Sequence, residues 1–199
     1  ETLAKVIPRD RLLVSMANNH AADFGIAHYR RTREAIRDAG FRLIGTTDSP
    51  GARVGDEVFV AAATRWTNQR HDYLPMIGRG DDPFGVSLVD RDAACNLLVP
   101  HWSYEHELYP RPEVIEMAHG LLDEWDGLVG HHPHVPNPIS SVDHGGRPRL
   151  VAWSLGQAST DIEWPIYRHG LALVAGLAIG VGEAADAIGA VAAMRLGHV

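Results

Sequence analysis

Short apolar runs alternate with amphipathic segments along most of the chain. The runs at residues 12–14, 97–99 and 128–129 are typical of buried strands. Residues 25–39 and 112–125 instead carry apolar side chains at helical intervals, and the second segment has a proline in its first turn. Strands that alternate with helices in this way predict an α/β fold with parallel strands.

The last third of the chain has a different pattern, in which apolar runs follow one another closely. Strands are predicted there at residues 138–142, 150–155, 171–179 and 187–196, and two earlier strands are predicted at 41–45 and 58–63. Turn signals lie at Gly145 and Gly146 and at residues 180–183. We expect the late strands to pair antiparallel and to form the second sheet of a β-sandwich. Residues 67–83 lack a period and predict a loop that borders the site.

Polar clusters follow the apolar runs at residues 12–14, 97–99 and 128–129. They occupy residues 18–23, 101–105 and 130–134, and each contains histidine beside amide or acidic side chains. The carboxyl ends of parallel strands meet at one edge of a sheet, where α/β proteins place their sites. Side chains at i and i+2 of an extended chain point to the same side, so His132 and His134 can share a site. Imidazole nitrogen with amide or carboxylate oxygen suits zinc, manganese or iron.

Composition fits one globular domain spanning residues 1–199. The chain is 45% hydrophobic and 22% charged, which is ordinary for such a domain. A net charge of −7 argues against general binding to nucleic acid or to a membrane surface. Cys95 is the single cysteine, so we expect a buried small side chain and no disulfide. We expect no signal peptide within this segment, and it has no apolar run of membrane-spanning length. Localisation, whether cytoplasmic or cell-surface, and oligomeric state are left open.

Four motifs together resemble the CapA family of poly-γ-glutamate capsule proteins, which belongs to the calcineurin-like metallophosphatase superfamily. They are Asn-Asn-His-x-x-Asp-x-Gly at 18–25, His-Trp-x-x-Glu at 101–105, Gly-His-His-Pro-His at 130–134 and Trp-Ser-Leu-Gly at 153–156. The resemblance implies a metallophosphatase-like β-sandwich flanked by helices, in four layers ordered α/β/β/α.

The resemblance also implies roles for individual residues. It implies four ligands of a dinuclear divalent-metal centre holding manganese, zinc or iron, namely Asn19, His101, His132 and His134. His20 would stabilise the transition state or act as the acid, and His132 would belong to both the metal and the catalytic set. Asp23 and Glu105 would orient histidines and fix their tautomers. Two metals about 3.5–4 Å apart would polarise a phosphoryl or carbonyl oxygen and activate water.

The chain also departs from the family pattern. The Gly-Asp and Asn-Leu-Glu segments that supply the first ligands do not precede residue 12, and the chain begins at Glu1. We therefore expect a domain that lacks its first strand-helix unit, with any membrane anchor lying outside this segment. Ser103 replaces the usual glycine and Gln157 the usual asparagine, which indicates an altered pocket or a metal site that has degenerated.

Three functions are compatible with these residues. The first is a metal-dependent hydrolase or transferase acting on a peptide-like or poly-γ-glutamate-type substrate. The second is a metal-independent peptide epimerase that uses one base on each face of an α-carbon. The third is a non-catalytic module that binds an anionic polymer. Trp102, Tyr104 and Gln157 are the candidate substrate-binding residues, because aromatic rings and an amide beside the motifs suit a peptide.

Overall fold

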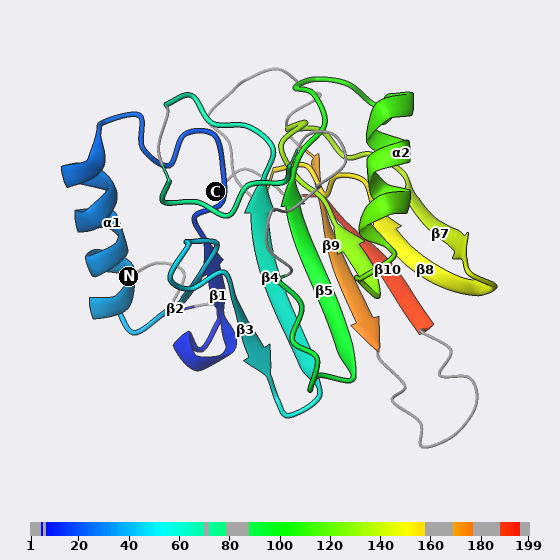
Figure 1. The fold of residues 1–199 in the computed structure, drawn as a ribbon, viewed down its shortest axis with the longest axis horizontal. Helices are drawn as coiled ribbons and strands as arrows, with labels where there is room; N and C mark the ends of the chain where they lie inside the picture. The colour runs from blue at the N-terminus through cyan, green and yellow to red at the C-terminus, as the bar shows by residue number, and fades with distance from the viewer. Residues whose placement is uncertain are drawn as a thin grey trace.

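The described elements are short strands with two α-helices between them (Figure 1). The computed structural model describes residues 5, 7–69, 72–78, 88–157, 169–176 and 188–195. In chain order its elements are the 3-10 helix η2 (Arg9–Arg11), β1 (Leu13–Ser15), α1 (Ile26–Asp38), β2 (Arg42–Ile44), β3 (Gly51–Val54), β4 (Val58–Thr64), β5 (Cys95–His101), α2 (Pro112–Leu121), β6 (Gly127–Val129), β7 (Ile139–His144), β8 (Arg147–Ala152), β9 (His169–Gly176) and β10 (Ile188–Arg195). The α/β class predicted from the alternating pattern is confirmed, and the arrangement is consistent with a partial metallophosphatase-like fold.

A mixed six-stranded sheet forms the centre of the described structure. Its strand order is β3-β4-β5-β6-β8-β7. Strands β4, β5, β6 and β8 are parallel, and β3 and β7 pair antiparallel at the two edges. The carboxyl ends of the four parallel strands therefore lie along one edge of the sheet, where the loops after β4, β5, β6 and β8 come together.

One sequence-based expectation about the sheets is wrong. Strands β7 and β8 do not belong to a second sheet, because β8 pairs parallel with β6, with Leu128 opposite Val151. The chain turns back at Gly145 and Gly146, which have φ of 61° and 76°, and β8 then returns beside β6. Strands β9 and β10 pair antiparallel in a sheet of their own, as their apolar runs predicted.

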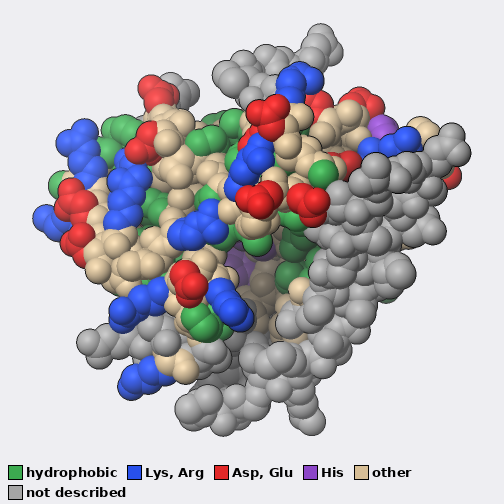
Figure 2. Space-filling view, turned by 90° about the horizontal axis from the view of Figure 1, so that it is seen from below, with side chains coloured by type: hydrophobic (Ala, Val, Ile, Leu, Met, Phe, Trp, Pro, Cys, Tyr) green, Lys and Arg blue, Asp and Glu red, His purple; other side chains and the backbone are tan. Residues whose placement is uncertain are grey.

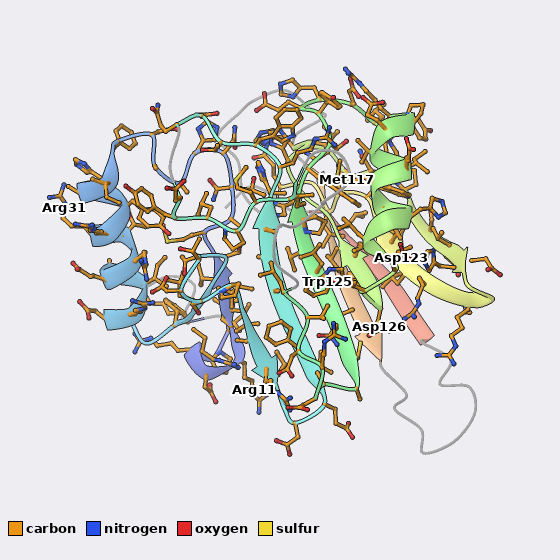
Figure 3. All side chains as sticks on the ribbon, viewed as in Figure 1. Arg11, Arg31, Met117, Asp123, Trp125 and Asp126 are labelled. Atoms are coloured by element: carbon orange, nitrogen blue, oxygen red, sulfur yellow. The ribbon has the colours of Figure 1, made fainter. Side chains whose placement is uncertain are left out.

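Helix α2 covers the sheet beside β5 and β6. Pro112 occupies its first turn, and Val114, Ala118 and Leu121 recur at helical spacing on the buried side. These side chains share one apolar core with Leu98 of β5 and others from β6 and β8. Trp125, Asp126 and Asp123 follow the helix, at the opposite end of β6 from the histidine motif (Figure 3). The helix thereby returns the chain to the start of β6 and sends both strands toward the same edge.

Helix α1 and strands β1 and β2 form a smaller unit. The helix ends at Asp38, and Gly40, whose φ of 82° is favourable for glycine, follows it as the predicted stop signal. Its Tyr29 is buried in a second core cluster together with Met16, Ala22, Leu43 and Leu74. Arg31 projects away from the sheet (Figure 3). Strand β1 pairs parallel with β2, not with β5 or β6. A third core cluster of Ala17, Ile44 and Ala62 joins this unit to β4, so the loop after β1 still reaches the sheet.

Several other expectations have a clear outcome. Strand β3 had no signal strong enough for prediction, since its Gly51–Val54 segment is short and mixed. The predicted loop at 67–83 has only an isolated bridge in its described part, and residues 70–71, 79–83 and the predicted turn at 180–183 lie outside the described residues.

Cys95 is buried, and burial raises the pKa of its thiol to about 11, which agrees with a packing role. Among the described residues, no helix is both long and apolar enough to cross a membrane.

Candidate metal centre

The loops after β5 and β6 run side by side beyond the sheet edge. Backbone hydrogen bonds join them, from the N–H of Trp102 to the carbonyl of His131 at 3.1 Å and from the N–H of His131 to the carbonyl of Pro100 at 3.1 Å. Gly130 makes this approach possible, because a Cβ there would lie 2.3 Å from Nε1 of Trp102 and 2.3 Å from the carbonyl oxygen of Trp153. The glycine of the Gly-His-His-Pro-His motif is thus a packing requirement that brings the histidine loop down onto the sheet.

Three side chains from these two loops converge. Glu105, His132 and His134 each offer one ligand atom, and these atoms all lie within 4.8 Å of one another. Oε1 of Glu105 is 3.8 Å from Nε2 of His134. Two imidazoles and one carboxylate are a ligand combination that zinc and similar divalent metals accept. The described structure therefore contains a group that can hold a metal ion, with Glu105 in a ligand position.

The backbone of the two loops is bent in an unusual way. Within the described residues, the non-glycine residues with positive φ are Ser103 at 64°, His106 at 68°, His132 at 106° and His134 at 66°. L-residues rarely adopt this conformation, and such strain concentrates at functional sites. The N–H of His106 donates to the carbonyl of Pro133 at 2.9 Å and ties the two bends together. Positive φ at His132 and His134 also shows that they do not follow the extended geometry assumed from their i and i+2 spacing.

His101 lies beneath this group. It is 3% exposed, and its ring centroid is 4.2 Å from that of His132. Its Nδ1 is 2.8 Å from Oγ1 of the buried Thr64. Burial, followed by the neighbouring His131 and His132, lowers the pKa of His101 to about 2. His101 is therefore a neutral imidazole at neutral pH.

The three histidines of the Gly-His-His-Pro-His motif are also neutral, and burial is again the main cause. Burial lowers the pKa of His131 to about 4 and that of His132 to about 4, and it also lowers the pKa of His134 despite the opposing charge of Glu105. A neutral imidazole keeps a nitrogen lone pair, which both metal binding and proton abstraction require. Nε2 of His131 and Nδ1 of His132 are buried and make no hydrogen bond with the described residues. Buried nitrogens of this kind need a ligand or water to satisfy them.

The loop after β1 contributes a histidine-carboxylate pair. Nδ1 of His20 is 2.5 Å from Oδ2 of Asp23, and this hydrogen bond is the main cause that lowers the pKa of the Asp23 carboxyl. Nδ2 of Asn68 donates to Oδ1 of Asp23 at 3.1 Å, and Oδ1 of Asn68 accepts from Nδ2 of Asn19 at 3.3 Å. With a carboxylate at Nδ1, that nitrogen carries the proton of His20, and Nε2 is left for other chemistry.

This pair faces the histidine loops. The loop after β4 links the two regions, because the N–H of Asn68 donates to the carbonyl of Asn19 at 3.1 Å and Nε1 of Trp66 donates to the carbonyl of Ser103 at 2.8 Å. Figure 2 views the molecule from below and shows histidine side chains inside a hollow of that face. The three polar clusters predicted from the sequence therefore come from separate loops and meet in one region.

Comparisons with known proteins relate the chain to bacterial capsule proteins. Residues 86–161, which include the loops after β5 and β6, match the family described as bacterial capsule synthesis protein PGA_cap. The resemblance to the CapA family that was seen in the sequence motifs is confirmed by this match. The capsule biosynthesis protein CapA of Bacillus anthracis is 25% identical over 190 residues, covering 82% of this chain and 44% of the relative. The PGA biosynthesis protein CapA of Bacillus subtilis (strain 168) is 23% identical over 168 residues, covering 76% of this chain and 43% of the relative. The chain thus spans less than half the length of these relatives, and no solved structure matches it.

The ligand set implied by the CapA resemblance is only partly reproduced. His132 and His134 converge, but their described companion is Glu105, which the resemblance placed as an orienting residue. His101 lies behind His132, and the side chain of Asn19 is hydrogen-bonded to Asn68. Among the described residues, His101 does not belong to the converging group of histidine and acidic side chains. The pairing of His20 with Asp23 does match the orienting role that was expected for Asp23.

The three residues expected to bind substrate differ in their burial and in their contacts. Trp102 is 0% exposed, stacks on Trp153 and donates from Nε1 to the Trp153 carbonyl at 3.0 Å, so a substrate cannot reach it. Its place among the substrate-binding candidates is corrected to a core position. Tyr104 is half-buried, with the guanidinium carbon of Arg111 3.6 Å from its ring centroid. Gln157 is half-buried, and its Nε2 makes no hydrogen bond with the described residues, so it is still a candidate.

Three residues around the CapA-family motifs were missed by sequence reasoning. Thr64 contacts His101, Asn68 contacts Asp23, and Nε2 of His106 lies 3.6 Å from Oε2 of Glu105. Asn68 had a weak signal, because it lies in the loop that was expected to border the site. Thr64 had none, since a threonine at the end of an apolar run is common in any strand. His106 follows the His-Trp-x-x-Glu motif directly but lies outside its pattern.

Proposed function

We propose that the chain is a metal-dependent hydrolase or transferase that acts on a peptide-like or poly-γ-glutamate-type anionic substrate. The convergence of Glu105, His132 and His134 within 4.8 Å carries this proposal. Similarity to CapA proteins of Bacillus that are named for capsule and PGA biosynthesis supports the choice of substrate class. The dinuclear centre and the four-layer sandwich expected from the resemblance are part of the same proposal.

The residues present fit a divalent metal. Two neutral imidazoles and a carboxylate match the ligand preference of zinc, and manganese and iron also accept this set. The lowered pKa of His132, about 4, keeps its lone pair available at neutral pH without competition from protons. Glu105, His132 and His134 would hold the ion. When bound, it supplies Lewis acidity that polarises a carbonyl or phosphoryl oxygen and lowers the pKa of water.

His20 is the candidate proton donor. Its Nδ1 is held by Asp23, so its Nε2 can carry a proton to a leaving group. Hydrolysis of an amide adds the oxygen of water to the carbonyl carbon, breaks the C–N bond and leaves an amine that needs this proton. The side chain of His20 is 60% exposed, so a substrate can approach it.

An anionic substrate needs a positive group because the chain carries a net charge of −7. Arg65 follows β4 directly, and its backbone N–H donates to the carbonyl of His101 at 2.9 Å. Its guanidinium carbon lies 5.5 Å from the ring centroid of Trp66, and its Nε is buried without a hydrogen bond to the described residues. We assign Arg65 and Gln157 as the candidate groups that bind the substrate carboxylates.

Metal content tests the proposal. Protein purified without chelator and without a metal-affinity step is measured by elemental mass spectrometry, together with His132→Ala and the matched control His119→Ala. His119 lies on α2 beside His144, away from the converging group. We expect at least about one equivalent of zinc, manganese or iron in the wild type and in the control, and its loss in His132→Ala. A folded wild-type protein that cleaves its substrate without metal would refute the proposal.

A metal-independent peptide epimerase is the second candidate. It is favoured by one observation, that neutral imidazoles at His132 and His134 lie near the separate His20–Asp23 pair. One base would remove the α-proton, and a protonated partner on the other face would return a proton. Incubation of a peptide substrate with chelator-treated protein in D₂O separates the two functions. Deuterium at an α-carbon without metal supports epimerisation, and its absence together with metal-dependent cleavage supports hydrolysis.

A further inference from the structure

Thr64 and His101 form a buried pair at the edge of the sheet. Each is the last residue of its strand, and the parallel register of β4 and β5 places them opposite one another. Their exposed fractions are 0% and 3%. Oγ1 of Thr64 lies 2.8 Å from Nδ1 of His101. Water has little access to this contact, so its donor and acceptor roles are decided by the protein groups around it.

The hydrogen bonds of the Thr64 hydroxyl identify which atom donates. A hydroxyl has one hydrogen and two lone pairs. Its Oγ1 lies 2.7 Å from the carbonyl oxygen of Trp66, which can only accept, so the hydroxyl hydrogen belongs to that contact. The N–H of Trp66 donates to Oγ1 at 3.2 Å and uses one lone pair. The remaining lone pair faces Nδ1 of His101, which must therefore be the donor.

The opposite assignment is unfavourable. If the hydroxyl donated to Nδ1 of His101, Oγ1 and the Trp66 carbonyl would be two acceptors 2.7 Å apart with no hydrogen between them. A buried contact of this kind loses a hydrogen bond and adds repulsion between oxygen atoms. The backbone fixes Trp66 next to Thr64, so this conflict cannot be relieved by a side-chain rotation of the tryptophan.

We propose that Thr64 is a positioning residue that holds His101 as the Nδ1–H tautomer, so that His101 presents an unprotonated Nε2 in the histidine cluster. The ring of His132 lies next to it, with 4.2 Å between centroids. Metal-binding histidines commonly have their other nitrogen fixed by such a partner. In this arrangement His101 can supply a lone pair to an ion or accept a hydrogen bond from a neighbouring imidazole. The consequence for metal binding rests on the proposed function, whereas the tautomer itself does not.

Threonine variants test the proposal with two readouts. Thr64→Val keeps the shape and removes the hydroxyl, and Thr64→Ser keeps the hydroxyl. Thr46→Val is the matched control, because Thr46 is also 0% exposed but its hydroxyl bonds Asp48. The first readout is ¹⁵N NMR of histidine-labelled, metal-free protein, in which the His101 signals are assigned by their loss in His101→Gln. The second is zinc affinity from a chelator-competition titration.

The expected results are specific. His101 should be protonated at Nδ1 in the wild type, in Thr64→Ser and in Thr46→Val, and should lose this preference in Thr64→Val. Zinc affinity should fall by about 10–100-fold in Thr64→Val and return in Thr64→Ser. The proposal is overturned if the wild type carries its proton on Nε2, or if Thr64→Val leaves the tautomer unchanged. If Thr64→Val does not fold, the wild-type spectrum decides. A wild type that binds no zinc contradicts the proposed function but leaves the tautomer test valid.

Discussion

Oε1 of Glu105 lies 3.8 Å from Nε2 of His134, although the two residues belong to loops that follow different strands. The carboxylate thereby joins His132 and His134 in a group that could hold a metal ion. The loops are held in this relation by the hydrogen bond from the N–H of His106 to the carbonyl of Pro133.

Replacing Glu105 by glutamine should weaken metal binding. The amide keeps the size of the side chain but removes the negative charge that a divalent ion needs. We expect zinc affinity to fall at least about 100-fold, since mutating even a residue that only hydrogen-bonds to a metal ligand lowers metal affinity about 10–100-fold. Glu113→Gln on the exposed side of α2 is the control. Equal affinities of the two variants, measured by chelator competition, would remove Glu105 from the ligand set.

Asp23→Asn should slow the reaction without unfolding the protein. Asparagine cannot stabilise a protonated His20 as a carboxylate does, so the proton donor becomes less effective. We expect kcat to fall by about 10²–10⁴-fold while the free energy of unfolding changes little, since both side chains are on the surface. Asp38→Asn at the end of α1 should leave kcat unchanged. A rise in KM with an unchanged kcat would indicate that the His20–Asp23 pair binds substrate and does not transfer a proton.

Trp102→Phe should act on stability. Its Nε1 donates to the buried carbonyl of Trp153 at 3.0 Å, and phenylalanine leaves that carbonyl without its donor and the core with a gap. We expect the free energy of unfolding, from urea denaturation, to fall by about 2–3 kcal/mol. KM should be unchanged, because a fully buried ring does not contact substrate. Tyr109→Phe, at a position that is 71% exposed, provides the comparison.

Ser103→Gly should stabilise the chain. Ser103 has φ of 64°, is 1% exposed, and its Oγ makes no hydrogen bond with the described residues. Glycine relieves the backbone strain and removes the unsatisfied hydroxyl, which together outweigh the added entropy of the unfolded chain. We expect a gain of about 1 kcal/mol in urea denaturation. Ser103→Ala separates the two contributions, because alanine removes the hydroxyl but keeps the strain.

The metal-free protein should lose stability as the pH falls below neutrality. The pKa of His101 is about 2 and that of His131 about 4 in the folded chain, against about 6.5 for an unfolded histidine. Between pH 6.5 and 4 the unfolded chain therefore binds more protons than the folded chain. The stabilisation is fully present above pH 6.5 and decreases as pH falls through this window. Urea denaturation between pH 7.5 and 4.5 measures the slope, and His131→Gln should make it shallower.

Much of the fold could be predicted because its signals are local. The helical spacing of Val114, Ala118 and Leu121 and the stop at Gly40 depend only on neighbouring residues, and both were confirmed. The pairing of β8 with β6 could not be predicted, since an apolar run such as that around Val151 fits either sheet of a sandwich. Strand partners are chosen by contacts between segments far apart in the chain, for which the pattern of a single segment carries no information.

The sequence by itself determined that histidine, acid and amide side chains follow strands, and that those after β5 and β6 meet at one sheet edge, since parallel strands send their carboxyl ends in the same direction. Only the tertiary structure decided which of them converge. It brings Glu105 to His132 and His134, places His101 beneath them against Thr64, and buries Trp102 in the core. The reason is physical: convergence depends on backbone bends at Ser103, His106, His132 and His134, and such bends are imposed by packing between loops and not by local preference.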